Sequence, residues 1–368
     1  MKLLLLAGEE SGVLYADKIR AEVLKAHPDA EICGYGDYGF EIADLGVMGL
    51  GQVLRKIFYF LRVKRTMERA IDAWKPDVVC TVDYPGMNLK LAAYAKRRGI
   101  RAVHVVCPQV WAWKKGRIPK IEASLDKLCC FFPFEPGLFK PGFAEFVGHP
   151  LVEEMGVEDR CRCRAEGEKI LAVLPGSRLG EIEQHMPVLV EVVKRLGTHG
   201  TDGTHAMPRV VIPAANEKAY RAILSYVSRL PSSSVQVELR RGGARDVLRQ
   251  ADAAIVASGT ATLEAALANC PTVLVYRVGW LFAFLARRFI KDIRHIGLAN
   301  VIAEKAGVPC PMPELLQEDF TAENVLAQIA PWLTDESANF NMRQRLAETV
   351  KLLRSDGDSV TKITRFLI

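Results

Sequence analysis

Three turns along the chain combine residue types that bind phosphate or move a proton. The first, Ser258, Gly259 and Thr260, follows an apolar run at 253–256 and precedes a helical pattern. Small side chains let a ligand approach the backbone, and the first N–H groups of a helix attract phosphate. Glu264, one turn further along, can accept hydrogen bonds from a ribose. The alternative is structural, because Ser and Thr are common helix N-caps.

The second turn carries an arginine. An apolar run at 169–174 leads into Gly176, Ser177 and Arg178. A guanidinium in such a turn can hold a diphosphate through two hydrogen bonds, and the alternative is an ordinary surface arginine. The pattern repeats the strand, glycine-containing turn and helix that residues 2–12 predict.

The third turn supplies a carboxylate. Asp83 follows a buried run at 77–82, and residues 88–98 have a helical pattern. Ligands of doubly wound folds bind beyond the carboxyl ends of the strands. Asp83 is therefore placed either for proton transfer or as the cap of the next helix. Glu9, in the turn after the first apolar run, faces either a substrate or solvent.

These turns need strands and helices in regular alternation to position them. Apolar runs, each followed by a turn and a helical pattern, predict two doubly wound α/β domains separated by a polar segment at 153–168. The N-terminal run is interpreted as the first strand and not as a cleaved signal, because it is short and enters a turn at once. The expected strands are 2–7, 77–82, 102–107 and 127–132, then 169–174, 209–213, 235–239, 253–257 and 271–276.

The composition excludes several classes of protein. With 368 residues and 49% hydrophobic content, the chain can bury two cores and is not disordered. The net charge is +6, but the basic residues are not interleaved with aromatic residues as in an RNA-binding motif. Nucleic acid is therefore not an expected partner. Nine cysteines without a Cys-x-x-Cys pair predict reduced thiols and no metal site. No apolar run approaches the roughly 20 residues of a membrane span.

One segment, 45–65, mixes aromatic, aliphatic and basic residues in a helical pattern. This favours contact with a membrane surface, and the alternative is a helix packed on its own domain with a basic edge. A second apolar and aromatic segment, at 280–290, is a further candidate for contact with a membrane or an acyl chain. The predicted membrane patch comprises Val53, Leu54, Arg55, Lys56, Ile57, Phe58, Phe60, Leu61, Arg62 and Lys64.

Taken together, the motifs resemble the lipid-A-disaccharide synthase family of GT-B glycosyltransferases. Six segments, 8–12, 82–89, 108–113, 146–151, 174–178 and 257–264, occur in the order and at about the spacing seen in that family. The resemblance covers nearly the whole chain and implies two Rossmann-like domains facing across a cleft, with a C-terminal helix crossing back to the first. It implies that the first domain, residues 1–155 together with 345–368, binds the acceptor and faces the membrane. The second domain, residues 156–344, is expected to bind the UDP-sugar donor.

The resemblance also implies an inverting reaction. The family transfers 2,3-diacylglucosamine from UDP-2,3-diacylglucosamine to the 6-hydroxyl of 2,3-diacylglucosamine 1-phosphate (lipid X), giving a β-1,6 disaccharide of lipid A biosynthesis and UDP. Asp83 matches the proposed base, and no metal or cofactor is expected. The implied donor-side residues are Gly176, Ser177, Arg178, Ser258, Gly259, Thr260, Glu264, Arg277 and Asn300. The implied acceptor-side residues are Glu9, Ser11, Gly12, Asn88, Gln109 and Trp111.

The resemblance implies that the protein is attached peripherally to the cytoplasmic face of the inner membrane of a Gram-negative-type bacterium. It is compatible with an oligomer. The chain departs from the family pattern at Val13, Cys107 and Ala299, where Asp, Ser and Pro are usual. These departures mostly touch the acceptor side. Two alternatives stay open: a UDP-sugar 2-epimerase, which shares the fold, and a lipid-binding protein without catalysis.

Overall fold

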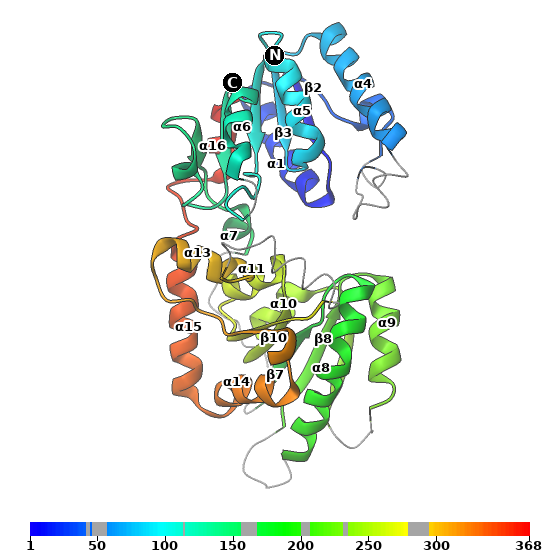
Figure 1. Cartoon of the computed structure of the whole chain (residues 1–368), viewed down its shortest axis with the longest axis vertical. Coiled ribbons are helices and arrows are strands. Elements are labelled where there is room, and N and C mark those ends of the chain that lie inside the picture. The colour runs from blue at the N-terminus through cyan, green and yellow to red at the C-terminus, as the bar shows by residue number, and fades with distance from the viewer. Residues whose placement is uncertain are drawn as a thin grey trace. The chain divides into compact units, whose positions relative to one another are not determined.

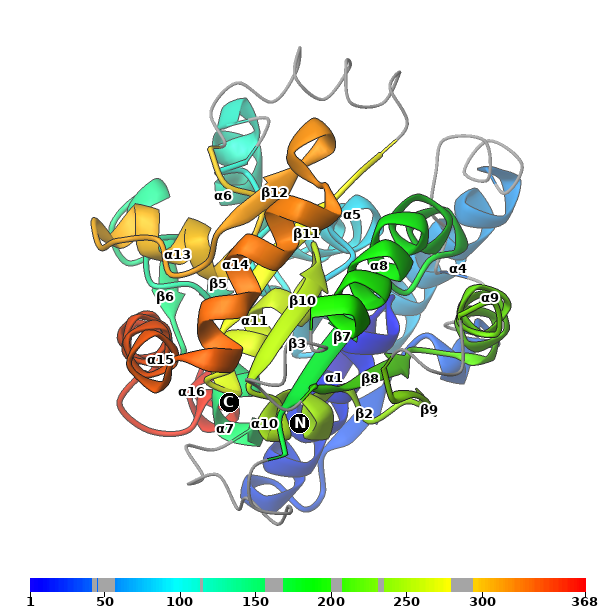
Figure 2. The same cartoon turned by 90° about the horizontal axis from the view of Figure 1, so that it is seen from below.

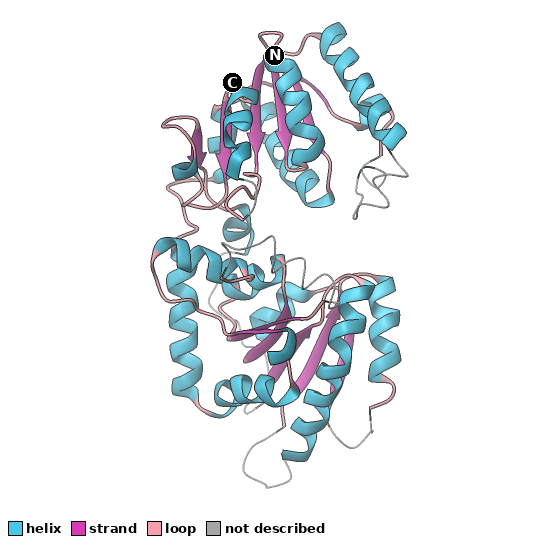
Figure 3. Cartoon of the chain, viewed as in Figure 1, coloured by secondary structure: helices cyan, strands magenta, loops and turns pink. Residues whose placement is uncertain are grey.

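The chain folds into two α/β units, shown in Figure 1. The computed structural model describes residues 1–41, 45, 57–112, 115–155, 168–199, 207–230, 235–278 and 294–368. The first unit comprises Met1–Glu153 and Leu353–Ile368, and the second comprises Glu154–Leu352. Each contains a six-stranded sheet, and helices alternate with the strands along the chain (Figure 3).

The first sheet is parallel throughout, with the strand order β2-β1-β3-β4-β5-β6. Four of its strands fall on the apolar runs that the sequence predicts, including the N-terminal run. The strands are β1 (Lys2–Ala7), β2 (Glu31–Cys33), β3 (Val78–Val82), β4 (Arg101–Val105), β5 (Lys127–Cys130) and β6 (Ala144–Phe146).

Helices cover both faces of this sheet because its strands are apolar on both sides. In β1, Leu3 and Leu5 pack with the helices α1 and α16, whereas Leu4 and Leu6 pack with α4 and α5. This alternation follows from the two-residue period of a strand. The helices are α1 (Glu10–Ala26), α4 (Ile57–Trp74), α5 (Pro85–Lys96), α6 (Ile118–Ser124) and α16 (Ser359–Arg365). Helix α7 (Pro150–Met155) begins in the first unit and ends in the second.

The second sheet is also parallel, with the order β12-β11-β10-β7-β8-β9, and Figure 2 shows β11, β10, β7 and β8 in sequence. Its strands are β7 (Ile170–Leu174), β8 (Arg209–Ala214), β9 (Val237–Arg241), β10 (Ala253–Ala257), β11 (Thr272–Tyr276) and β12 (Glu314–Leu316). Its helices are α8 (Leu179–His199), α9 (Glu217–Val227), α10 (Ala244–Gln250), α11 (Thr260–Leu267), α13 (Leu298–Ala306), α14 (Ala322–Thr334) and α15 (Glu336–Lys351).

The C-terminal segment returns to the first unit later than residue 345. Helix α15 belongs to the second unit, and the return begins at Leu353. Helix α16 then packs beside α1, and Ser359 donates from its backbone nitrogen and its hydroxyl to the carboxylate of Glu153, at 2.7 and 2.9 Å. Among the described residues, no helix combines the length and apolarity needed to cross a bilayer.

Each sheet has one point where the strand order reverses. In the first sheet it lies between β1 and β3, and in the second between β7 and β10. The loops that leave two such neighbouring strands run to opposite sides, so a crevice opens beyond their carboxyl ends, where ligands of this fold bind. The turns at Glu9 and Asp83 lie at the first reversal, and those at Arg178 and Ser258 lie at the second.

Candidate functional site

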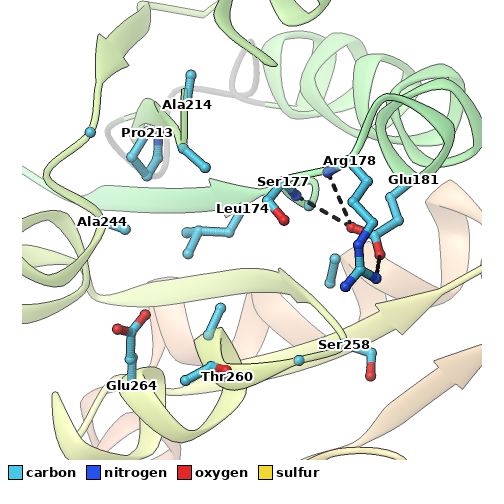
Figure 4. A pocket seen from close by; sticks show the side chains of 16 residues that line it. Leu174, Ser177, Arg178, Glu181, Pro213, Ala214, Ala244, Ser258, Thr260 and Glu264 are labelled. Carbon is cyan, nitrogen blue, oxygen red and sulfur yellow. Dashed lines mark hydrogen bonds and ion pairs between the residues drawn. The ribbon is translucent and has the colours of Figure 1, made fainter. Parts of the chain in front are cut away.

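A pocket of about 340 Å³ lies at the reversal point of the second sheet (Figure 4). It is formed beyond the ends of β7, β8 and β10, by the turns that lead into α8 and α11. The structure therefore brings together predicted donor-side residues separated by up to 88 positions in sequence. Those that line the pocket are Gly176, Ser177, Arg178, Ser258, Gly259, Thr260 and Glu264.

The turn between β7 and α8 already holds a negatively charged group. The carboxylate of Glu181 accepts hydrogen bonds from the backbone nitrogens of Ser177 and Arg178, at 3.3 and 3.5 Å, and pairs with the Arg178 guanidinium at 3.0 Å. Gly176 has φ +115°, and an added Cβ would lie 2.9 Å from the Glu181 Cβ. The turn is thus built for close approach of an anion, and a side chain of the protein fills that role here.

The turn between β10 and α11 leaves backbone N–H groups available to a ligand. Gly259 precedes α11 with φ +131° and ψ −161°, a conformation that essentially only glycine adopts. The hydroxyl of Thr262 donates to the Gly259 carbonyl at 2.8 Å, which fixes the turn. Neither Ser258 nor Thr260 caps α11, so the N-cap alternative is wrong for both: the residue at the N-cap is Gly259, and it has no side chain.

Glu264 is held in place by an arginine that sequence reasoning missed. Arg245 Nε donates to Glu264 Oε1 at 2.9 Å, and Arg245 Nη1 donates to Glu154 Oε2 at the same distance. Glu264 also lines the pocket, where a carboxylate can accept a hydrogen bond from a ribose hydroxyl. No spacing rule links residues 154, 245 and 264, so only the fold reveals this chain of contacts.

Two predicted donor-side residues do not line the pocket. The Arg277 guanidinium donates to the carbonyls of Gln317 and Phe320, and its backbone nitrogen donates to His185. Asn300 is fully buried. Its Nδ2 donates to the Met312 carbonyl, and its Oδ1 accepts from the Met312 backbone nitrogen. These side chains hold the loop around β12 to the sheet, because buried polar groups must be satisfied inside the protein.

In the first unit, Asp83 lies directly beyond β3 in a strained turn. Asp83 and Tyr84 both have left-handed backbones, with φ +51° and +50°. The Asp83 nitrogen donates to the Val105 carbonyl at 2.9 Å, and its Oδ1 accepts from the Tyr84 nitrogen at 2.8 Å. Strain of this kind costs about 1–3 kcal/mol per residue and persists where the surroundings enforce it, often at active sites. Helix α5 begins at Pro85, so Asp83 does not cap it from the N-cap position.

Asn88 fixes this turn from beneath. Its Nδ2 lies 2.8 Å from the Asp83 carbonyl and 3.1 Å from the carbonyls of Leu6 and Val82, while its Oδ1 accepts from the hydroxyl of Tyr35 at 2.7 Å. Asn88 is fully buried. It therefore joins the ends of β1 and β3 and positions Asp83, and its predicted contact with an acceptor stays a prediction.

A second carboxylate lies near Asp83. Burial raises the pKa of Glu9, and the negative charge of Asp83 raises it further. Burial also raises the pKa of Asp83, partly opposed by the hydrogen bond from Tyr84. A carboxyl group with a raised pKa is a better proton acceptor from a hydroxyl than an ordinary aspartate. Gly12, in the first turns of α1, is buried, and a Cβ added to it would lie 3.4 Å from the Val82 carbonyl oxygen. The Ser11 side chain lies outside the described residues.

The remaining acceptor-side residues differ in exposure. Gln109 is exposed, whereas Trp111 is buried and its Nε1 donates to Glu135 at 3.3 Å. Glu135 is 1% exposed, and its ligand-capable oxygen lies within 4.8 Å of the sulfurs of Cys107 and Cys130. Spacing along the chain does not predict this group of possible metal ligands, because its members come from separate segments.

Glu135 makes stability depend on pH. Burial raises the pKa of this carboxyl to about 8. In the unfolded chain the pKa of this carboxyl is about 4.5, and below that pH the group is protonated in both the folded and the unfolded state. Between pH 4.5 and 8 only the unfolded state loses its proton, so the folded state loses relative stability as pH rises. In denaturant titrations, Glu135→Gln should gain stability relative to the parent chain over this interval; a constant difference across it would contradict the assignment.

The predicted membrane patch is only partly described. Val53, Leu54, Arg55 and Lys56 lie outside the described residues, as does the segment 280–290. Helix α4 buries Val63, Met67 and Ile71 against the first unit, so most of it is a packed helix. Its first turns expose Phe58 at 82% and both Ile57 and Leu61 at 43%, beside exposed Arg62. Phe60 and Lys64 are half-buried.

Comparison with known proteins gives a consistent result. The sequence model of the lipid-A-disaccharide synthetase family matches residues 3–362. A lipid-A-disaccharide synthase of Neisseria meningitidis serogroup A is 34% identical over 95% of this chain and 93% of its own length. Lipid-A-disaccharide synthase 1 of Legionella pneumophila is 34% identical over 96% of this chain and 94% of its own length. The lipid-A-disaccharide synthase of Chromohalobacter salexigens is 35% identical over 92% of this chain and 89% of its own length.

Solved structures share the fold at low sequence identity. A UDP-GlcNAc 2-epimerase of Neisseria meningitidis, bound to UDP-GlcNAc, gives a TM-score of 0.60 at 12% identity over 100% of this chain and 99% of its own. The calicheamicin glycosyltransferase CalG4 gives 0.60 at 15% identity over 99% and 98%. MurG of Acinetobacter baumannii gives 0.56 at 16% identity over 96% and 99%. These similarities confirm the predicted GT-B fold.

Proposed function

The chain belongs to the lipid-A-disaccharide synthetase family of GT-B hexosyltransferases, and from this we propose its substrates. The donor is UDP-2,3-diacylglucosamine and the acceptor is 2,3-diacylglucosamine 1-phosphate. The products are the β-1,6-linked lipid A disaccharide 1-phosphate and UDP. The observation that carries the proposal is the pocket beyond β7, β8 and β10, whose anion-binding turns fit a nucleoside diphosphate.

In the proposed mechanism, Asp83 takes the proton from the 6-hydroxyl of the acceptor while that oxygen attacks the anomeric carbon of the donor. The bond between this carbon and the diphosphate oxygen breaks, and the configuration inverts. Arg178 and the backbone N–H groups at Ser177 and Gly259 neutralise the negative charge that develops on UDP. Positive charge from these groups is what the transfer needs, so we expect no requirement for a metal ion or cofactor.

A UDP-sugar 2-epimerase is the main alternative, because solved epimerases share the fold. Their identity to this chain is 12–13%, whereas the lipid-A-disaccharide synthases reach 33–35% over nearly the whole chain. The exposed apolar turn at the start of α4 also suits a lipid substrate. Both observations favour the transferase.

The deciding experiment is an assay of the purified chain with both diacylated substrates in neutral detergent micelles. UDP release and disaccharide formation should proceed in equal amounts, and EDTA should leave the rate unchanged. Turnover of UDP-N-acetylglucosamine without any lipid acceptor would instead identify an epimerase. Binding of the lipids without UDP release would identify a protein that lacks catalysis.

We further propose that α4 attaches the enzyme peripherally to the cytoplasmic face of the inner membrane. Phe58→Asp replaces the most exposed aromatic side chain of α4 with a charge that does not enter a bilayer. Affinity for vesicles containing anionic lipid, measured by co-sedimentation, should fall about tenfold. Phe340→Asp, at a phenylalanine of α15 that is 59% exposed, is the matched control and should change nothing. Equal losses in both variants would exclude a specific role for α4.

A further inference from the structure

A second pocket, of about 290 Å³, is lined by helices of the first unit. It is bordered by α4, α5 and α6, and Figure 1 shows α5 between the other two helices. Its charged lining consists of Lys64, Glu68, Lys90, Arg97, Arg117 and Lys120. Leu89 and Ile121 provide an apolar floor.

The positive charge of this pocket is largely uncompensated. Lys64 pairs with Glu68 at 2.6 Å, and Glu68 is the only carboxylate among the described residues that line the pocket. Within the described part of the chain, Lys90, Arg97, Arg117 and Lys120 have no carboxylate partner; Arg97 faces only the ring of Tyr94. Four like charges around one cavity repel one another, and a bound anion relieves that repulsion. Lysine and arginine together are the usual ligands of phosphate.

The pocket begins beside the proposed base. Its lining includes Pro85 and Gly86, the first two residues of α5, and Asp83 precedes Pro85 by two residues. Lys90 lies about one helical turn beyond Gly86, roughly 6 Å along α5. A sugar whose hydroxyl reaches Asp83 can therefore extend a charged substituent from its opposite side toward Lys90.

We propose that this pocket binds the phosphate monoester of the acceptor sugar while the 6-hydroxyl of the same sugar lies at Asp83. The inference rests on the proposed function, and it adds the site that selects a phosphorylated acceptor. A lipid headgroup offers the same phosphate chemistry, so the experiment must separate the two sources.

The test compares acceptors with and without the 1-phosphate in neutral detergent micelles that contain no phospholipid. In the double variant Lys90→Glu and Lys120→Glu, the KM for the phosphorylated acceptor should rise about tenfold or more, with the KM for the donor unchanged. The preference for the phosphorylated over the unphosphorylated acceptor should be lost. Arg69→Glu with Lys140→Glu makes the same change of charge at exposed positions of the same unit outside this pocket, and should keep the preference.

A binding measurement keeps this test independent of turnover. Calorimetric titration with glucosamine 1-phosphate should show binding to the parent chain and the control, and a loss of about tenfold or more in the double variant. Equal binding to all three proteins would overturn the proposal even if the disaccharide assay succeeds. If the double variant keeps the preference for the phosphorylated acceptor and loses only its binding to anionic vesicles, the proposal would be overturned. The pocket would then bind a lipid headgroup.

Discussion

Asp83→Asn should lower kcat for disaccharide formation by about 100- to 10,000-fold, the usual contribution of a general base. The amide retains the shape of the side chain, and its oxygen can still accept from the Tyr84 nitrogen, so the strained turn persists. Affinity for UDP, measured by calorimetry, should be unchanged because the proposed nucleotide pocket belongs to the second unit. Asp29→Asn, the same chemical change in an exposed turn, should keep full activity. Full turnover by the Asp83 variant would remove this residue as the base.

The pH profile provides a second test of the same role. A base acts only when ionised, so kcat/KM should rise with pH through the pKa of Asp83. Burial raises that pKa above the usual value of about 3.9, so the rise of kcat/KM with pH should occur at a higher pH than for an ordinary aspartate. Asp83→Asn removes the negative charge that raises the pKa of Glu9, so the pKa of the Glu9 carboxyl, followed by NMR, should fall in that variant. A Glu9 pKa that does not move in Asp83→Asn would show that the two groups are not coupled.

The sequence could predict these two sites because of local rules. Buried parallel strands appear as short apolar runs, and the turn after each run marks the carboxyl end of a strand. Asp83, Arg178 and Ser258 follow three such runs, and the structure places all of them at the reversal points of the sheets. Since ligands of this fold bind there, the position in the strand order is informative even without a diagnostic motif.

Long-range partners could not be predicted in this way. Asn88 had the residue type of a ligand contact, but its amide is used by Tyr35 and by the ends of β1 and β3. Asn300 and Arg277 are occupied by backbone groups of the loop around β12. A polar side chain near a strand end satisfies either a ligand or the protein's own backbone, and only the packed fold decides which.

The cysteines illustrate the same limit. Spacing along the chain predicted no metal site, yet Cys107, Cys130 and Glu135 converge in the core. The hydrogen bond with Cys130 and burial both raise the pKa of the Cys107 thiol, and Glu135 contributes in the same direction.

The pair of Arg178 and Glu181 offers a test in which two substitutions should have opposite effects. In the structure the Glu181 carboxylate occupies the N–H groups of Ser177 and Arg178 and also pairs with the arginine. A diphosphate bound in this turn must take over those donors. Arg178→Met should therefore weaken UDP binding about 10- to 100-fold, the value of one or two charge-assisted hydrogen bonds. Arg178→Lys should lose less, since it keeps the charge but not the paired geometry.

Glu181→Gln should instead tighten UDP binding, because the neutral side chain releases Arg178 and removes a negative charge from the path of the diphosphate. Calorimetry with UDP and with uridine separates this effect from a general change in the pocket, because uridine carries no phosphate and its affinity should stay constant in both variants. If Glu181→Gln weakens UDP binding as Arg178→Met does, Glu181 holds the arginine in its binding position. In that case the carboxylate is part of the bound site and not the group that the diphosphate replaces.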